Sequence, residues 1–228
     1  EVIAYANDTV GNVGSYRILV TVDNTAPTVT IIAPTNNSVV GGSVDIQVSS
    51  SDPHPDKTWL TINGSVVQTW VGDGNFTYSW GTTTYADGVY EIIAYANDTA
   101  GNTGSCRILV TVDNTGPDVN IIDPYDGVYV NGVVTIIFSA SDPNNVSLVE
   151  LYIDGVLKYS NDTDYSSATY TYDWDTSTEP EGNHTINVTA YDVVGNANSV
   201  EITVCVDRTP PSITITSPAN NTEFTSSG

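Results

Sequence analysis

Apolar and polar residues alternate along most of the chain, in short runs that are rich in β-branched and aromatic residues. This period of two is typical of β-strands with one buried face, and Gly, Pro, Asn and Asp mark turns between the runs. No helical period is present. Within residues 25–114 the pattern predicts seven strands, at 28–33, 43–50, 58–63, 66–70, 74–80, 89–97 and 105–113. The chain is therefore predicted to be all-β, built as an antiparallel sandwich of two sheets.

The same alternation assigns core positions. Trp80 and Trp174 are expected to fill the cores, and Asn63-Gly64 and Asp154-Gly155 are expected to form tight hairpin turns. Tyr90 stands where a tyrosine corner is common, and His184 takes its place in the next repeat. The strand residues expected to point inward are Ile92, Ala94, Ala96, Ile108, Val110 and Val112, with Ile186, Val188, Ala190, Ile202, Val204 and Val206 as their counterparts.

A long internal repeat organises the chain. Residues 1–27 and 91–117 are identical at 22 of 27 aligned positions, and a diverged third copy ends at Pro211. The proline landmarks at 27, 117 and 211 give periods of about 90 residues, which is the length of a domain. The predicted units are 25–114 and 115–208. Residues 1–24 correspond to the C-terminal hairpin of a preceding repeat, and 209–228 to the first strand of a following one.

This arrangement resembles a known family. The Val-Asp-Asn-Thr-Ala-Pro junction at 22–27, the Ala-x-Asp-x-x-Gly-Asn hairpin at 190–196 and the Ile-Asp-Gly turn at 153–155 are similar to the immunoglobulin-like repeats of large bacterial and archaeal surface proteins. The resemblance covers nearly the whole chain. It implies tandem immunoglobulin-like sandwiches, two complete with partial copies at both ends, in a cell-surface setting. It implies no particular ligand.

Charge narrows the function classes. The chain carries 5 basic and 27 acidic residues, a net charge of −22. Nucleic-acid binding and docking on anionic membranes both need basic patches, so neither is expected. No apolar run is long enough to cross a bilayer as a helix, so no direct membrane insertion is expected.

Catalysis is not expected either. The two histidines, His54 and His184, lie in no recognisable catalytic motif. The carboxylate pairs Asp173/Asp175 and Glu179/Glu181 could in principle transfer protons, but they lie in or beside predicted loops, where a solvated acidic rim is the favoured interpretation. No cofactor is required.

Asn-x-Ser/Thr triplets are frequent and none falls on an expected core position. A chain so rich in Asn, Ser and Thr produces some of them by chance, but their exposed placement favours N-glycosylation of several. The candidate sites are Asn7, Asn36, Asn63, Asn75, Asn97, Asn145, Asn161, Asn183, Asn187 and Asn220.

Calcium is a second candidate ligand. In immunoglobulin-like sandwiches the second inter-strand loop and the last hairpin lie beside the linker from the preceding domain. Three acids should therefore meet at each junction, and carboxylates are calcium ligands. The alternative is that each Asp caps its own turn, which the sequence favours because no calcium-loop motif is present. The first set is Asp23, Asp52 and Asp98, and the second is Asp113, Asp142 and Asp192.

The two cysteines are not equivalent. Cys106 is expected to face inward as a small buried hydrophobe, whereas Cys205 faces outward and is either free or bonded to another chain. An intrachain disulfide is not expected, because the two belong to different repeats. Trp59 and Tyr95 point outward by parity and could stack on sugars or on a neighbouring chain, although half-buried strand positions are more common.

Together these features favour an extracellular structural protein, a rod of tandem domains in a cell-surface filament, appendage or envelope stalk. Its expected partners are copies of itself or other envelope proteins. The alternatives are an adhesin that binds carbohydrate or a partner cell, and a spacer array of a larger secreted enzyme. Neither partial repeat can bury a core alone, and together they lack the equivalent of residues 45–90, so completion by unseen chain is favoured over strand exchange.

Overall fold

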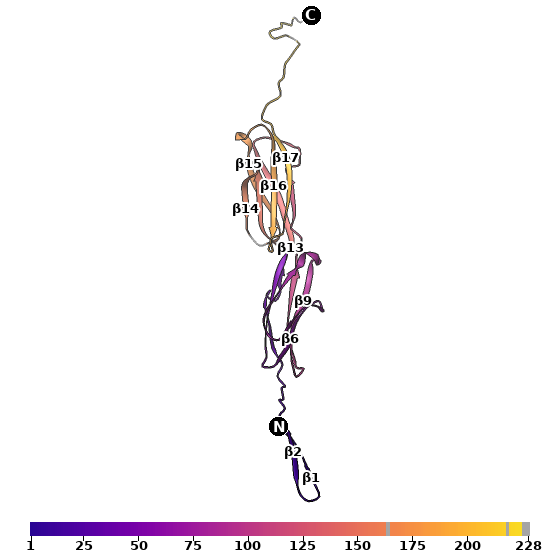
Figure 1. Ribbon diagram of the computed structural model, residues 1–228. Coiled ribbons are helices and arrows are strands. Elements are labelled where there is room, and N and C mark those ends of the chain that lie inside the picture. Colours follow the sequence, from indigo (N-terminus) through magenta and orange to yellow (C-terminus); the bar gives the residue numbers. More distant parts are fainter. Residues whose placement is uncertain (163–164, 218, 225–228) are drawn as a thin grey trace. The chain divides into compact units, whose positions relative to one another are not determined.

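A computed structural model describes residues 1–162, 165–217 and 219–224 (Figure 1). The chain divides into two compact units. Unit 1 comprises Glu1–Thr115 with Val194–Asn196, and unit 2 comprises Gly116–Val193 with Ala197–Gly228. Regular structure in the described residues is β-strand, apart from two single 3-10 turns, η1 (Thr82–Thr84) and η2 (Thr176–Thr178). The all-β prediction is confirmed.

Unit 1 contains a two-sheet sandwich. One sheet has the order β3-β5-β8 and the other β4-β10-β9-β6-β7. The predicted strands are found within a few residues of their expected bounds. Only β4 was not anticipated; it pairs in parallel with the end of β10. The strands are β3 (Thr28–Ala33), β4 (Ser38–Val40), β5 (Ser43–Ser51), β6 (Pro55–Ile62), β7 (Ser65–Val71), β8 (Gly74–Gly81), β9 (Gly88–Asp98) and β10 (Thr103–Val112).

Unit 2 repeats this plan with one difference. Where unit 1 has separate strands β5 and β6, unit 2 has one continuous strand, β13 (Val133–Ile153). Its first half pairs with β11 and β15 and its second half with β14 and β16, so it passes from one sheet to the other through register shifts around Val146. The other strands are β11 (Asp118–Asp123), β12 (Tyr129–Val130), β14 (Val156–Asn161), β15 (Tyr165–Asp175), β16 (Gly182–Asp192) and β17 (Ala197–Val206).

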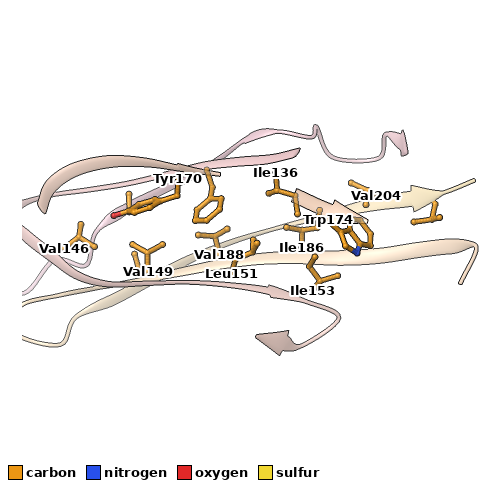
Figure 2. Packing of buried hydrophobic residues seen from close by; sticks show 14 residues of the cluster. Ile136, Val146, Val149, Leu151, Ile153, Tyr170, Trp174, Ile186, Val188 and Val204 are labelled. Carbon is orange, nitrogen blue, oxygen red and sulfur yellow. The ribbon is translucent and has the colours of Figure 1, made fainter. Parts of the chain in front are cut away.

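Each unit has its own hydrophobic core between its sheets. Trp80 is fully buried in unit 1 and Trp174 nearly so in unit 2, as predicted. Figure 2 shows Trp174 packed with Ile153, Ile186 and Val204. The predicted inward positions on β9, β10, β16 and β17 are all buried except Ile202, which is half-buried against the same core. These side chains come from strands far apart in sequence, so each core exists only in the folded sandwich.

Two turn predictions are confirmed. Asn63 and Asp154 have positive φ values of 46° and 50°, and the glycine after each continues in the left-handed region. This backbone requires residues that accept φ > 0, which is why Asn-Gly and Asp-Gly occupy the turns. The Tyr90 hydroxyl donates to the carbonyl of Ala86 at 3.0 Å, the bond of a tyrosine corner.

The N-terminal segment forms a separate two-stranded sheet of β1 (Val2–Asn7) and β2 (Val13–Ile18). Its sequence nearly duplicates β9 and β10, yet Val2 is 52% exposed whereas its counterpart Ile92 is fully buried. In the predicted partial repeat 209–228, no strand forms in 209–217 or 219–224, while 218 and 225–228 lie outside the described residues.

Candidate functional site

The end of unit 1 that carries its N-terminal linker holds a cluster of acidic and imidazole groups. Asp23, in the linker, places a carboxylate oxygen 3.1 Å from Nδ1 of His54, and its other oxygen accepts from the Thr25 amide at 3.0 Å. Asp52 accepts from the His54 amide at 2.7 Å. One potential ligand atom of each of Asp23, Asp52 and His54 lies within 4.8 Å of the others. The cluster is thus built partly from carboxylates that cap their own turns.

Asp98 does not belong to this cluster of three, although the sequence placed it there. It is buried, and its two oxygens accept from the backbone amide and side-chain amide of Asn102 at 2.8 and 2.6 Å. Burial by itself would raise the pKa of Asp98, but the hydrogen bonds from Asn102 and the adjacent turn outweigh it and lower the pKa below 3.8. Asp98 therefore stabilises the β9–β10 hairpin as an ionised cap.

The acids of the second predicted set also cap turns. Asp113 accepts from the Thr115 amide at 3.2 Å, and Asp142 accepts from the Asn144 amide at 2.7 Å. Within unit 2, carboxylate oxygens of Asp142 and Asp192 lie within 4.8 Å of each other, and both residues are buried. Oxygen donors of this type suit Ca²⁺, and the capping bonds suit the alternative. Calcium binding by these residues stays an untested alternative to capping.

The linker entering unit 1 is held by that unit's last hairpin. The side-chain amide of Asn102 donates to the carbonyl of Asp23 at 3.1 Å. A Cβ on Gly104 would overlap with the carbonyl oxygen of Pro27, so the linker lies directly on the backbone of β10. Asn196 donates to the carbonyl of Asp113, also at 3.1 Å and within the same compact unit.

The segment that leaves each sandwich is clamped by a carboxylate. In unit 1, Asp87 accepts from the Asn114 amide at 2.8 Å and from the Thr115 hydroxyl at 2.5 Å. The Asn114 side chain also donates to the carbonyls of Thr82 and Tyr85, each at 3.1 Å. The residues immediately after β10 are therefore held to the turn before β9.

Unit 2 carries the same clamp with different residues. Glu181 accepts from the Arg208 amide at 3.1 Å and from the Thr209 hydroxyl at 2.8 Å. The Arg208 guanidinium donates to the carbonyls of Ser177 and Glu179 at 2.6 and 2.7 Å. The sequence interpretation of Glu181 as part of a solvated acidic rim does not include this clamp. The signal was the fixed spacing of 27 or 28 residues between an acid and the Asn-Thr or Arg-Thr pair.

The other three carboxylates of the pairs Asp173/Asp175 and Glu179/Glu181 also accept hydrogen bonds that stabilise the fold. Asp173 accepts from the Thr135 hydroxyl at 2.7 Å, and Asp175 accepts from the Ser177 amide at 2.9 Å. Glu179 accepts from the indole nitrogen of Trp174 at 3.3 Å. These bonds hold the strand and turn around η2.

The sequon asparagines fall into two groups by exposure. Six are exposed: Asn7, Asn36, Asn63, Asn75, Asn183 and Asn220. Four are half-buried: Asn97, Asn145, Asn161 and Asn187. Position 163, which completes the Asn161 sequon, lies outside the described residues.

Two of the half-buried sequons are tied into the fold. The Asn97 side-chain nitrogen donates to Asp56 at 2.9 Å, and its oxygen is enclosed without a hydrogen-bond partner. In the Asn145 sequon, the Ser147 hydroxyl donates to the carbonyl of Asp192 at 2.6 Å. Asn75 differs, because its side chain is exposed on the outer face of β8.

No disulfide joins Cys106 and Cys205 within this chain. Cys106 faces the core of unit 1 as predicted but is half-buried rather than buried, and Cys205, which was expected to face outward, is also half-buried. Trp59 and Tyr95 are cross-strand neighbours on β6 and β9 and stack at 5.1 Å, with the Lys57 ammonium 5.5 Å from the Trp59 ring centre. Their mutual stacking gives both rings a structural role in the outer face of this sheet.

Comparison with known proteins decides the family. The model of the family described as "Bacterial Ig domain" matches residues 27–94 and 117–188, together more than half of the chain. The chain belongs to the bacterial Ig domain family. A second model, "Bacterial Ig-like domain (group 3)", matches residues 168–226. No curated protein matches the sequence of this bacterial Ig domain protein.

Solved structures resemble it at low identity. The fibronectin(III)-like modules of CbhA from Clostridium thermocellum are 24% identical, with 78% of this chain and 94% of that chain covered and a TM-score of 0.44. An I-band fragment of titin is 17% identical, with 81% and 66% covered and a TM-score of 0.52. The titin similarity supports the immunoglobulin-like fold alone.

Family membership gives the coarse setting. Bacterial Ig domains are typically non-catalytic and commonly extracellular, and tandem repeats of them are consistent with a structural or spacer role. Across the described residues, no helix has the length and apolar character needed to span a membrane.

Proposed function

We propose that this bacterial Ig domain protein is an extracellular structural rod, a stretch of tandem spacer domains in a cell-surface filament, appendage or envelope stalk. The proposed partners are further copies of the chain or other envelope proteins. Repeated domains of a typically non-catalytic family, each with its own core, support this role. A net charge of −22 supports it as well, since mutual repulsion keeps exposed strand edges from pairing wrongly.

The observation that carries the proposal is the repeated carboxylate clamp on the outgoing linker. A flexible tether would leave its first residues free, but Asp87 and Glu181 each bind a backbone amide and a threonine hydroxyl just after the last strand. Bonds to a carboxylate are stronger than neutral ones. The two units differ in most clamp residues, yet in each a carboxylate accepts from a backbone amide and from a threonine hydroxyl. Retention of both bonds favours a mechanical requirement for a fixed linker where it leaves the sandwich.

Prolines restrict the linkers further. Pro27 and Pro117 are buried, and each follows a short Asn-Thr-x segment. Proline fixes its own φ and disfavours helical backbone in the residue before it, so the linker has few alternative conformations. Length would then scale with the number of repeats, which is what a stalk or filament needs.

The exposed sequons fit the same role. Glycans on exposed asparagines such as Asn75 and Asn183 would solvate a surface that has few charged residues, and would cover sheet faces without disturbing either core. We propose N-glycosylation at exposed sequons.

The clamp can be tested by pulsed electron–electron double resonance, which measures the distribution of distances between two spin labels. Thr77 on β8 and Thr171 on β15 are equivalent exposed positions, so cysteine at each gives one label per unit, with the native cysteines replaced by their repeat counterparts (Cys106→Val, Cys205→Thr). We expect a narrow distance distribution that broadens in Asp87→Ala. The control Asp45→Ala removes an exposed carboxylate of β5, a strand that pairs with β3 and β8 rather than with the linker, and should leave the width unchanged.

An equally broad distribution in the unmutated chain and in Asp87→Ala would refute the stiff-linker mechanism. Electron microscopy of native material tests the larger setting, because a filament requires an ordered axial repeat. Saturable binding on a glycan array, lost on mutation of the loops, would instead identify an adhesin and count against a purely structural role.

A further inference from the structure

Unit 2 differs from unit 1 by a paired exchange at one corner of the sandwich. Unit 1 has Asn63 in the hairpin turn and Tyr90 on the neighbouring strand; unit 2 has Asp154 and His184 at the equivalent positions. Asn63 accepts from the Glu91 amide at 2.8 Å, and one oxygen of Asp154 accepts from the Thr185 amide at 2.9 Å. The turn bond is therefore the same in both units. Where Asn63 has a side-chain amide nitrogen, Asp154 has a second carboxylate oxygen.

That second oxygen is bound by the imidazole of His184. Nδ1 of His184 lies 2.6 Å from Oδ2 of Asp154, and Nε2 lies 2.9 Å from the carbonyl oxygen of Pro180. The His184 side chain is 6% exposed. An ionised carboxylate and a backbone carbonyl can only accept hydrogen bonds. Only the doubly protonated imidazolium donates to both, so the geometry selects the charged form.

The surrounding charges favour the same form. Burial by itself would lower the pKa of His184, but the bonds to Pro180 and Asp154 and the negative charges of Asp154 and Glu179 outweigh it. The pKa of His184 is therefore raised above its ordinary value of 6.5. Glu179 is itself fixed by Trp174, whose ring packs edge-on against the imidazole at 5.4 Å.

The bonds of His184 and those of the linker clamp meet at one loop, residues 179–181. Residues 179–181 accept from His184 through the Pro180 carbonyl, from the Arg208 guanidinium through the Glu179 carbonyl, and from the Arg208 amide through the Glu181 carboxylate. In unit 1 the corresponding corner is closed by Tyr90, which packs with Trp80 and Tyr85 and donates its hydroxyl to the Ala86 carbonyl, so no imidazole takes part.

We propose that His184 is a proton-controlled latch that holds the 179–181 loop, and with it the Arg208–Thr209 linker segment, in place in unit 2. This inference rests on the proposed function, because it makes the stiffness of the linker that leaves unit 2 depend on pH. Unit 1, with tyrosine at the corner, has no such control.

The direction of the effect follows from linkage. Because the pKa of His184 is raised on folding, its contribution to stability is complete below about pH 6.5 and is lost as the pH rises through the folded-state pKa. The pKa of Asp154 is lowered: burial opposes this, but the bonds from Thr185 and His184 and the imidazolium charge outweigh it. Its contribution is lost only as the pH falls below about 3.8 and through the lowered value. The latch is thus closed in mildly acidic solution and opens as the pH rises through the raised pKa of His184.

Nuclear magnetic resonance of the full chain tests the latch directly. The chain has two histidines, so the ring nitrogen signals of His184 can be assigned by loss in His184→Tyr, with His54→Tyr assigning the other. We expect His184 to be doubly protonated at pH 6.5, with a titration midpoint above that value. A single neutral tautomer at pH 6.5 would overturn the proposal.

Amide hydrogen exchange, corrected for its intrinsic pH dependence, tests the coupling to the linker. Protection of the Arg208 amide should fall between pH 6 and pH 9, by up to about tenfold for each unit of pKa elevation, since one unit is a factor of ten in the equilibrium. The equivalent Asn114 amide in unit 1 is the internal control and should not change.

The matched variant is the double exchange Asp154→Asn with His184→Tyr, which installs the pair of unit 1. It should abolish the pH dependence at Arg208 while keeping the corner folded. Persistence of that dependence would refute the latch even if the spin-label distances show a stiff linker, and a broad distance distribution would refute the rod without affecting the titration of His184. The two proposals therefore fail separately.

Discussion

The contact between the incoming linker and the last strand of unit 1 gives a sharp prediction. Gly104 lies on β10 opposite Ala96, and a Cβ there would overlap with the carbonyl oxygen of Pro27. The overlapping atom is backbone and cannot rotate away, so Gly104→Ala must displace either the linker or the strand. We expect the variant to fold with a strained or detached linker and reduced stability of unit 1.

The magnitude follows from the nature of the clash. Overpacking by one methyl group costs about 1–3 kcal/mol, and a clash with backbone belongs at the upper end of that range. For a domain of this size, each kcal/mol lowers the melting temperature by about 4–8 °C. Alanine favours a strand more than glycine does by less than about 1 kcal/mol, which offsets only part of the loss.

Differential scanning calorimetry of the full chain measures the effect, with the transition of unit 2 as an internal reference. Gly81→Ala is the matched control: it places a methyl group in open space at the end of β8, in the same unit, where no atom lies within 4 Å. The reasoning is refuted if Gly104→Ala melts at the same temperature as the unmutated chain, or if Gly81→Ala lowers the melting temperature by as much.

Three further outcomes are expected. Glycopeptide mapping of native material should find Asn75 modified and Asn97 unmodified, because the Asn97 amide is enclosed and bonded to Asp56; a glycan on Asn97 would contradict this. Since Asp23 and Asp98 already cap their own turns, melting temperatures in EDTA and in millimolar Ca²⁺ should be equal, whereas a ligated ion would raise the second. Tyr90→Phe should destabilise unit 1 by about 1 kcal/mol in chemical denaturation, through loss of the corner hydrogen bond, and an unchanged free energy of unfolding would contradict it.

The acidic residues show where prediction from sequence reached its limit. Spacing along the chain indicated that Asp23 and Asp52 would approach each other, and their ligand atoms are indeed close together. It placed Asp98 with them, but the cluster contains His54 instead, and both oxygens of Asp98 accept from Asn102. Side-chain hydrogen bonding within the turn at 98–102 decides such details, and alternation of apolar residues carries no information about it.

What the sequence determined by itself is the local and periodic part of the protein. Alternation in β9 and β10 fixed which side chains face inward, and the Asn63-Gly64 dipeptide fixed a turn, because backbone geometry and φ preferences act over a few residues. Whether an inward-facing side chain is buried depends also on the sheet that packs against its strand. Val2 and Ile92 lie in nearly identical sequences, yet only Ile92 is buried, since only it has an opposing sheet. The clamps and the His184 latch likewise join residues about 30 positions apart, so they exist only once the strands have packed.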